Sequence, residues 1–110
     1  MYHEPVEELS SKTRDVAKAL DSLKEEVEAI NWYHQRVDTC NDPELKKVLE
    51  HNRDEEIEHA VMTIEWLRRN MAGWDEELNT YIFGKGDITM LEEKAENNEE
   101  ENRTDLGLNH

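Results

Sequence analysis

The sequence predicts an all-α fold in which two long helices form an antiparallel hairpin. Apolar residues recur at alternating intervals of three and four along two long segments, which is the spacing of one helix face. A single short break, at residues 40–43, separates the segments. No segment shows the apolar–polar alternation of a strand. Because the connection is short, we expect the two helices to pack side by side and antiparallel, as half of a four-helix bundle.

The first helix is expected to begin near Val6 and to continue to Val37. Its apolar stripe consists of Val6, Leu9, Val16, Leu20, Leu23, Val27, Ile30 and Val37. The stripe stops before Asn41, Asp42 and Pro43. Either Asn41 or Asp42 is suited to cap the next helix, and Pro43 suits its first turn.

The second helix is expected to begin at Pro43 and to stop between Asn70 and Gly73, since glycine favours the position after a helix end. A shorter helix is expected at Trp74–Phe83, followed by the glycine-containing segment 84–86. A last, weaker helix is expected from Asp87 to about Ala95, with Asp87 as its cap.

The C-terminal segment differs in composition from the rest of the chain. Glu96–Asn102 is charged, rich in amides and without periodicity, so we expect it to be disordered. Leu106-Gly107-Leu108 then forms a small apolar return. The predicted organisation is therefore one helical domain at 1–95 and an acidic tail at 96–110.

Composition restricts the functions that the chain can have. The 28 acidic and 13 basic residues give a formal net charge of −15, which argues against nucleic acid as a partner. Metal cations suit such a surface, although plain solubility accounts for the charge equally well. No apolar run approaches the roughly 20 residues of a membrane span, and no signal pattern is seen, so a soluble, cytoplasmic protein is expected. Cys40 is the single cysteine, and we interpret it as a structural thiol.

Ionisable residues interrupt the apolar stripe of the second helix. Glu56 and His59 follow Leu49 along this face before apolar residues resume at Met62. Residues three apart share a helix face, so both side chains are able to approach one metal ion. A bound cation would also offset the cost of burying a carboxylate, which is several kcal/mol when it has no partner.

Glu26 is the matching carboxylate on the first helix. It lies fifteen residues before Asn41, and Glu56 lies fifteen residues after it, so an antiparallel hairpin places both about 22 Å from the turn at 1.5 Å per residue. Tyr33 lies seven residues beyond Glu26 on the same stripe. Spacing leaves open whether Tyr33 donates a hydrogen bond to the site or packs beside it.

These residues make up half of a di-iron donor set. Di-iron carboxylate bundles use one Glu from each of two helices and a Glu-x-x-His from each of the other two. One chain supplies Glu26 and the Glu56–His59 pair, and symmetric pairing of two chains would supply the rest. With 35% apolar residues the chain also has little material for a core of its own, so pairing would meet both needs. Such ligands suit Fe(II) and Mn(II), with zinc as a competitor that does no redox chemistry.

Other readings of these residues remain open. A lone Glu-x-x-His on an acidic helix is a weak signal, and it also fits a non-redox metal binder or a metal-free helical interaction module. We interpret His51, Glu55 and Glu58 as mostly solvated, with Glu55 a candidate for supporting a ligand. His34 is interpreted as a satisfied or exposed histidine.

Three segments of the chain resemble encapsulated ferritins. They are Glu25–Tyr33, His51–Ala60 and Glu65–Asn70, within a match of roughly His3 to Phe83. In that family each chain is a helical hairpin, two chains build a four-helix ferroxidase site, and dimers form a ring of ten subunits inside an encapsulin shell that stores the iron mineral. The resemblance therefore implies a ferroxidase that oxidises Fe(II) with dioxygen and that is held in an encapsulin nanocompartment.

The resemblance also implies roles for individual residues. Glu26, Glu56 and His59 match the iron ligands, and Tyr33 matches a residue beside the centre. Glu25 and Glu28 match acidic positions that attract metal on the way to the site, although spacing alone would equally make them solvated carboxylates. Calcium and zinc are further candidate occupants of these sites. Leu106-Gly107-Leu108 loosely resembles the short apolar peptide by which family members dock on the shell.

Overall fold

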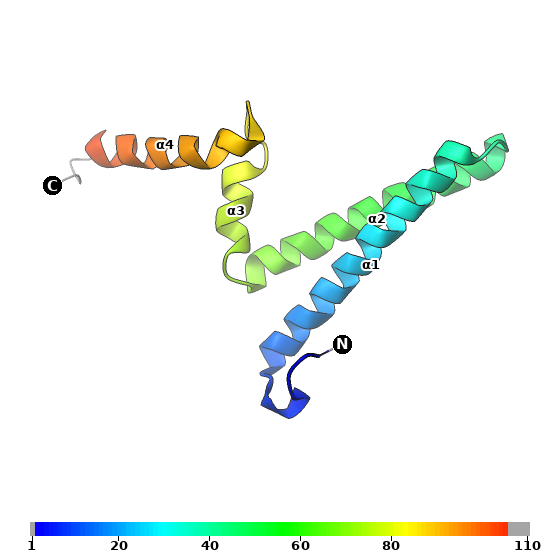
Figure 1. Ribbon diagram of the computed structural model, residues 1–110, viewed down its shortest axis with the longest axis horizontal. Helices are drawn as coiled ribbons and strands as arrows, with labels where there is room; N and C mark the ends of the chain where they lie inside the picture. Colours follow the sequence, from blue (N-terminus) through cyan, green and yellow to red (C-terminus); the bar gives the residue numbers. More distant parts are fainter. Residues whose placement is uncertain (1, 106–110) are drawn as a thin grey trace. The chain divides into compact units, whose positions relative to one another are not determined.

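The chain is built from helices. The computed structural model describes residues 2–105, with side chains as far as residue 101. Its elements are η1 (Val6–Glu8), α1 (Ser11–Thr39), α2 (Pro43–Asn70), α3 (Trp74–Tyr81), η2 (Ile88–Met90) and α4 (Leu91–Asp105) (Figure 1). Within residues 2–105 there is no strand, and the all-α prediction is confirmed. The chain divides into two compact units, one ending at Met71 and the other beginning at Ala72.

The first unit is the expected hairpin of α1 and α2, which pack together along their length (Figure 1). Asp42 caps α2, because its Oδ1 accepts a hydrogen bond from the Leu45 amide at 2.8 Å. Pro43 occupies the first turn of α2, where the missing amide proton costs nothing. The predicted bounds of the second helix are therefore confirmed.

The prediction that the first helix begins near Val6 was wrong, because a separate short element precedes it. Val6–Glu8 forms a short 3₁₀ turn, Leu9 is extended, and α1 begins only at Ser11. The physical reason is Ser10, whose Oγ accepts a hydrogen bond from the Thr13 amide at 3.0 Å and so starts a new helix. The apolar stripe runs across this cap and does not reveal it.

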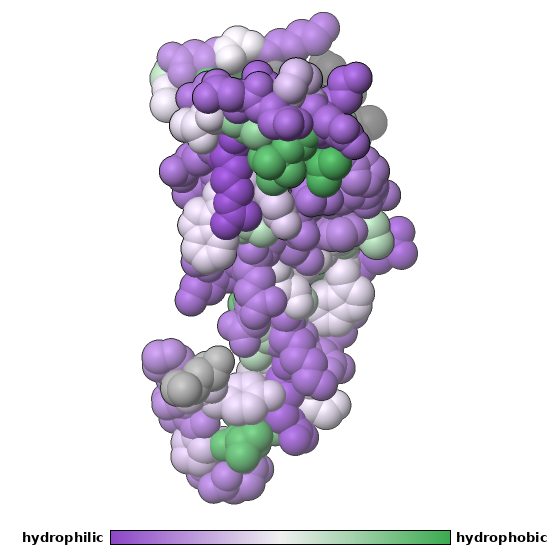
Figure 2. All heavy atoms as spheres, turned by 90° about the vertical axis from the view of Figure 1, so that its right-hand side faces the viewer, coloured by the Kyte–Doolittle hydropathy of each residue, from purple (hydrophilic) through white to green (hydrophobic). Residues whose placement is uncertain are grey.

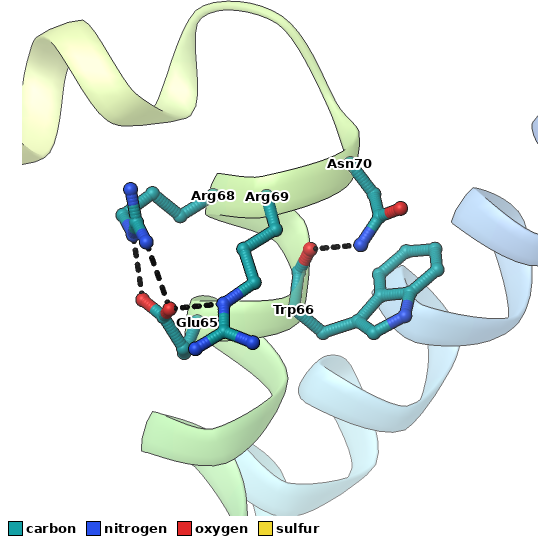
Figure 3. Close-up of polar contacts among 5 residues, drawn as sticks. All are labelled: Glu65, Trp66, Arg68, Arg69 and Asn70. Atoms are coloured by element: carbon teal, nitrogen blue, oxygen red, sulfur yellow. Dashed lines mark hydrogen bonds and ion pairs between the residues drawn. The ribbon is translucent and has the colours of Figure 1, made fainter.

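The end of α2 is marked by charged and amide side chains. Glu65 accepts hydrogen bonds from Arg68 Nε and Arg69 Nε, both at 2.6 Å, and Asn70 Nδ2 donates to the Trp66 carbonyl at 2.8 Å (Figure 3). The hydrogen bonds from Arg68 and Arg69 lower the pKa of Glu65 from 4.5 to about 2. Two arginines in the last turn also suit the negative end of the helix dipole.

The core of the described chain is small. Four apolar side chains are buried among residues 2–101, and they are Val37, Ala60, Leu67 and Leu91. Leu67 is the one with no exposed surface. Large apolar residues remain open to solvent on the hairpin, such as Val61 at 59% and Met62 at 61% exposure. The face seen in Figure 2 is mostly hydrophilic and is interrupted by small hydrophobic patches.

The second unit contains α3 and α4, which contact each other. Here α3 ends at Tyr81, two residues before the predicted Phe83, because Ile82 is extended and Phe83 takes a φ of 62°. Asp87 caps the turn η2, since its Oδ1 accepts a hydrogen bond from the Thr89 amide at 2.9 Å.

The disorder expected at Glu96–Asn102 was wrong, because α4 continues through this segment to Asp105. Glutamate is a good helix former, and the acidic first turn of α4 suits the positive end of the helix dipole. Composition indicated disorder because it measures the lack of an apolar stripe and not local helix propensity. The predicted division into a helical domain at 1–95 and a tail at 96–110 stays a prediction. The predicted shell-docking segment Leu106–Leu108 lies outside the described residues.

No helix of the described chain is both long and apolar enough to cross a membrane.

Cys40 is a free, half-buried thiol whose Sγ lies 3.6 Å from the Asp42 carbonyl oxygen. It therefore lies at the hairpin turn, in agreement with a structural role.

Candidate metal site

An open groove of about 490 Å³ runs between α1 and α2 on one face of the hairpin. Its lining includes Ser22 and Glu26 from α1, and His59, Met62, Thr63 and Trp66 from α2. The spacing of these residues is helical on both elements, so each helix presents one edge to the groove. The structure therefore brings Glu26 and His59, two of the three predicted ligands, to one surface.

His59 pairs with Glu56 on the same helix. The distance from His59 Nδ1 to Glu56 Oε2 is 3.6 Å, and the two side chains are 46% and 28% exposed. On its other side the ring faces Glu55, with His59 Nε2 at 3.9 Å from Glu55 Oε2. The imidazole thus lies between two carboxylates. This arrangement favours a nitrogen that binds a cation while the other nitrogen carries a proton toward a carboxylate.

The side chain of Glu26 contacts α2 farther from the hairpin turn than Glu56, the residue that counting from the turn places opposite it. Its carboxylate accepts a hydrogen bond from Thr63 Oγ1, at 3.1 Å to Oε2 and 3.3 Å to Oε1. Thr63 follows Glu56 by seven residues, or about two helical turns. The reason is that side chains lean toward the N-terminus of their own helix, so Glu26 leans away from the hairpin turn and Glu56 leans toward it. Counting residues from the turn predicts which backbone positions lie opposite each other, but it does not predict where the side-chain carboxylates lie.

The side chains at the groove are suitable donors for iron. Carboxylate oxygen with imidazole nitrogen is the donor set that Fe(II) and Mn(II) accept, and Glu26 approaches the same turn of α2 that carries His59. Among the described residues of one chain, no three His, Cys, Asp or Glu side chains converge closely enough to hold a metal ion. In one hairpin, Glu26 and His59 line the same open groove, and Glu56 lies beside His59 on α2.

Other predicted residues lie outside this groove. Tyr33 is half-buried and its ring faces the guanidinium of Arg36, with 5.2 Å from Arg36 Cζ to the ring centre. This contact is of the cation–π type. Glu25 and Glu28 are exposed, and neither is part of the groove lining. Their roles stay predictions.

The remaining histidines of the hairpin have their own partners. Arg53 Nη1 lies 3.3 Å from His34 Nδ1, and since arginine is always the donor, His34 accepts. The interpretation of His34 as a satisfied histidine is confirmed. His51 is 72% exposed and pairs with Glu55, with 3.6 Å between Nε2 and Oε1.

The sequence did not predict the other residues that line the groove, which are Lys18, Ala19 and Ser22 on α1 and Met62, Thr63 and Trp66 on α2. The spacing predicts Met62 only as a member of the apolar stripe. Thr63 had a signal that was available, since it lies four residues after His59 and so on the same helix face. Thr63 was not predicted because its neutral hydroxyl is not a typical metal ligand and does not contribute to the charge pattern.

Comparison with known proteins extends this description. The EncFtn-like family matches the chain over residues 1–85. This chain belongs to the EncFtn-like family. Membership in a ferritin-like family supports an iron-related role for the protein. The matched range covers the whole hairpin and α3, and thus every predicted ligand.

Two curated relatives and one solved structure agree with this family. A "ferritin-like protein" of Thermotoga maritima is 59% identical over 107 residues, which cover 97% of this chain and 94% of the relative. An "encapsulated ferritin-like protein" of Rhodospirillum rubrum is 57% identical over 90 residues, which cover 82% of this chain and 64% of the relative. The crystal structure of a protein from Nitrosomonas europaea is similar with a TM-score of 0.76 and 53% identity, covering 79% of this chain and 96% of the other.

Proposed function

We propose that this protein is a ferroxidase that oxidises Fe(II) to Fe(III) with dioxygen at a di-iron site shared by two copies of the chain. The observation that carries the proposal is the groove that Glu26 and His59 line together, with the Glu56 carboxylate 3.6 Å from the His59 ring. Membership in a ferritin-like family supports iron as the substrate.

The stoichiometry of ligands supports a site between chains. A di-iron bundle takes two single glutamates and two Glu-x-x-His pairs, and one chain offers one of each. Two hairpins related by a twofold axis would face each other across their grooves and complete the set. The same contact would cover Met62, which is 61% exposed beside His59. The homodimer is thus the proposed catalytic unit, and the ring of ten subunits is proposed from the family resemblance.

Each residue has a defined task in this proposal. Glu26 and Glu56 bind Fe(II) through oxygen and favour the ferric product, because carboxylates stabilise the higher positive charge. His59 adds a nitrogen donor and is oriented by the carboxylates of Glu55 and Glu56. Two Fe(II) ions give up one electron each, and these two electrons, with two protons from solvent, reduce one dioxygen molecule to the level of hydrogen peroxide. Tyr33 is proposed beside the centre, and Glu25 and Glu28 as acidic positions that draw cations toward it.

We further propose that the protein works inside an encapsulin nanocompartment, where the ferric product is stored. The support is the relative of Rhodospirillum rubrum that is named as encapsulated. The C-terminal tail is the proposed docking segment for the shell protein. The net charge of −15 fits a surface that gathers Fe(II) and repels nucleic acid.

The test is an anaerobic Fe(II) titration of the metal-free protein followed by air, with ferric absorbance and oxygen consumption recorded together. Glu56→Ala and His59→Ala are expected to abolish the fast oxidation. Glu50→Ala is the matched control, because Glu50 is on the same helix but points about 120° away from Glu56 at 100° per residue.

Two outcomes would reject the proposal. Wild-type oxidation rates in Glu56→Ala or His59→Ala would show that these residues are not iron ligands. Metal binding without oxygen consumption in the wild type would instead identify a non-redox metal-binding protein.

A further inference from the structure

Thr63 is the residue through which α2 contacts a predicted ligand on α1. Its Oγ1 lies 3.1 Å from Glu26 Oε2, and also 3.0 Å from the main-chain oxygen of His59. We propose that Thr63 is a positioning residue, which holds the carboxylate of Glu26 at the groove, beside the turn that carries His59, before a metal ion arrives. This inference rests on the proposed function, because it takes Glu26 as an iron ligand.

The hydroxyl proton decides which contact is made. A threonine hydroxyl has one proton and two acceptors within reach, the carboxylate of Glu26 and the carbonyl of His59. The ionised carboxylate is the stronger acceptor, so the proton points across the groove to Glu26. The His59 carbonyl needs no second donor, since the amide of Thr63 bonds to it within the helix. No polar group loses a partner when the hydroxyl turns to Glu26.

This contact leaves Glu26 ready to bind a cation. The hydroxyl shares its single proton between the two oxygens of Glu26, nearer to Oε2, so most of the carboxylate lone pairs stay free for a metal ion. Glu26 and Thr63 are both half-buried, so water competes less for the hydrogen bond than at the exposed surface. Fixing a glutamate before binding also removes part of the entropy that ordering it would otherwise cost.

Two other hydrogen bonds between α1 and α2 do not involve a predicted ligand. Lys12 donates to Asn70 Oδ1, and Arg53 donates to His34. The hydrogen bond of Thr63 is distinct because it joins a predicted ligand on α1 to the helical turn that carries another. It thereby couples the packing of the hairpin to the geometry of the metal site.

The experiment measures Zn(II) affinity of the full-length, metal-free protein by calorimetry. Thr63→Val keeps the shape and removes the hydroxyl, and Thr63→Ala removes it with a better helix former. We expect both to weaken Zn(II) binding by about 10–100-fold, the usual loss when a partner of a ligand is removed. Thr63→Ser restores the hydroxyl and should restore the affinity.

Two comparisons separate positioning from a general structural effect. Thr39→Val is the matched control, because Thr39 Oγ1 bonds to the Gln35 carbonyl of its own helix at 3.3 Å and touches no predicted ligand. It should bind Zn(II) like the wild type. In a Glu26→Gln background, Thr63→Val should cause no further loss, since its effect is transmitted through Glu26. Wild-type affinity in Thr63→Val and Thr63→Ala, or an equal loss with and without Glu26, would overturn the proposal.

The same data separate this inference from the ferroxidase proposal. Zn(II) binding needs no dioxygen, so a wild type that binds zinc in a Thr63-dependent way but does not oxidise iron rejects the ferroxidase and supports the positioning role. A wild type that oxidises iron, with Thr63 variants of unchanged affinity, rejects the positioning role alone. A wild type that binds no divalent ion rejects both.

Discussion

Leu67 should be the most costly apolar residue of the hairpin to remove. It is fully buried at the packed face of α2, whereas Leu45 on the same helix is 50% exposed. Truncation of leucine to alanine removes three carbon groups, worth about 2.4 kcal/mol of transfer free energy at about 0.8 kcal/mol each. A buried site adds a cavity penalty, so we expect Leu67→Ala to lower the free energy of unfolding by about 3–4 kcal/mol. The half-exposed Leu45 should cost about 1 kcal/mol, with no cavity term.

Urea unfolding followed by far-ultraviolet circular dichroism measures both losses. The titrations are made at several protein concentrations, because association of copies would raise the apparent stability. Equal losses for Leu67→Ala and Leu45→Ala would refute the ranking taken from this hairpin. If the two losses of stability were equal only at high protein concentration, Leu45 would be buried by a second copy of the chain.

The remaining predictions concern assembly, pH and the tail. Met62→Glu should prevent pairing of hairpins and lower iron oxidation, because it places a charge in the face proposed to be buried. Sedimentation velocity would measure the loss of the dimer, with Met90→Glu in the second unit as the control. An intact dimer in Met62→Glu would contradict this prediction. The pKa of Glu65 is lowered from 4.5 to about 2, so its contacts with Arg68 and Arg69 stabilise the fold fully above pH 4.5 and less as the pH falls toward 2. Glu65→Gln should therefore lose less stability than the wild type when the pH is lowered over that range. Parallel curves of stability against pH for the two proteins would contradict this prediction. Deletion of Leu106–His110 should leave iron oxidation intact and abolish loading into the shell when co-expressed with an encapsulin, and unchanged loading would reject the tail as the docking segment.

The sequence by itself determined the helical hairpin. Periodicity and the cap at Asp42 are local properties, because they depend on residues a few positions apart, and they gave the bounds of α2 correctly. The Glu56–His59 pair was predictable for the same reason, since three-residue spacing on a helix fixes a shared face. Local signals were missed where a polar cap interrupts an apolar stripe, as at Ser10, and where helix propensity acts without a stripe, as in α4.

Only the tertiary structure decided which groups meet across the hairpin. Counting from the turn paired Glu26 with Glu56, but the carboxylate of Glu26 meets Thr63, because side chains of antiparallel helices lean in opposite directions. The groove that contains Glu26 and His59, and the partner of His34, likewise depend on the packing of α1 against α2. Such contacts join residues far apart in the chain, and a periodic pattern along one helix carries no information about the rotation of its neighbour.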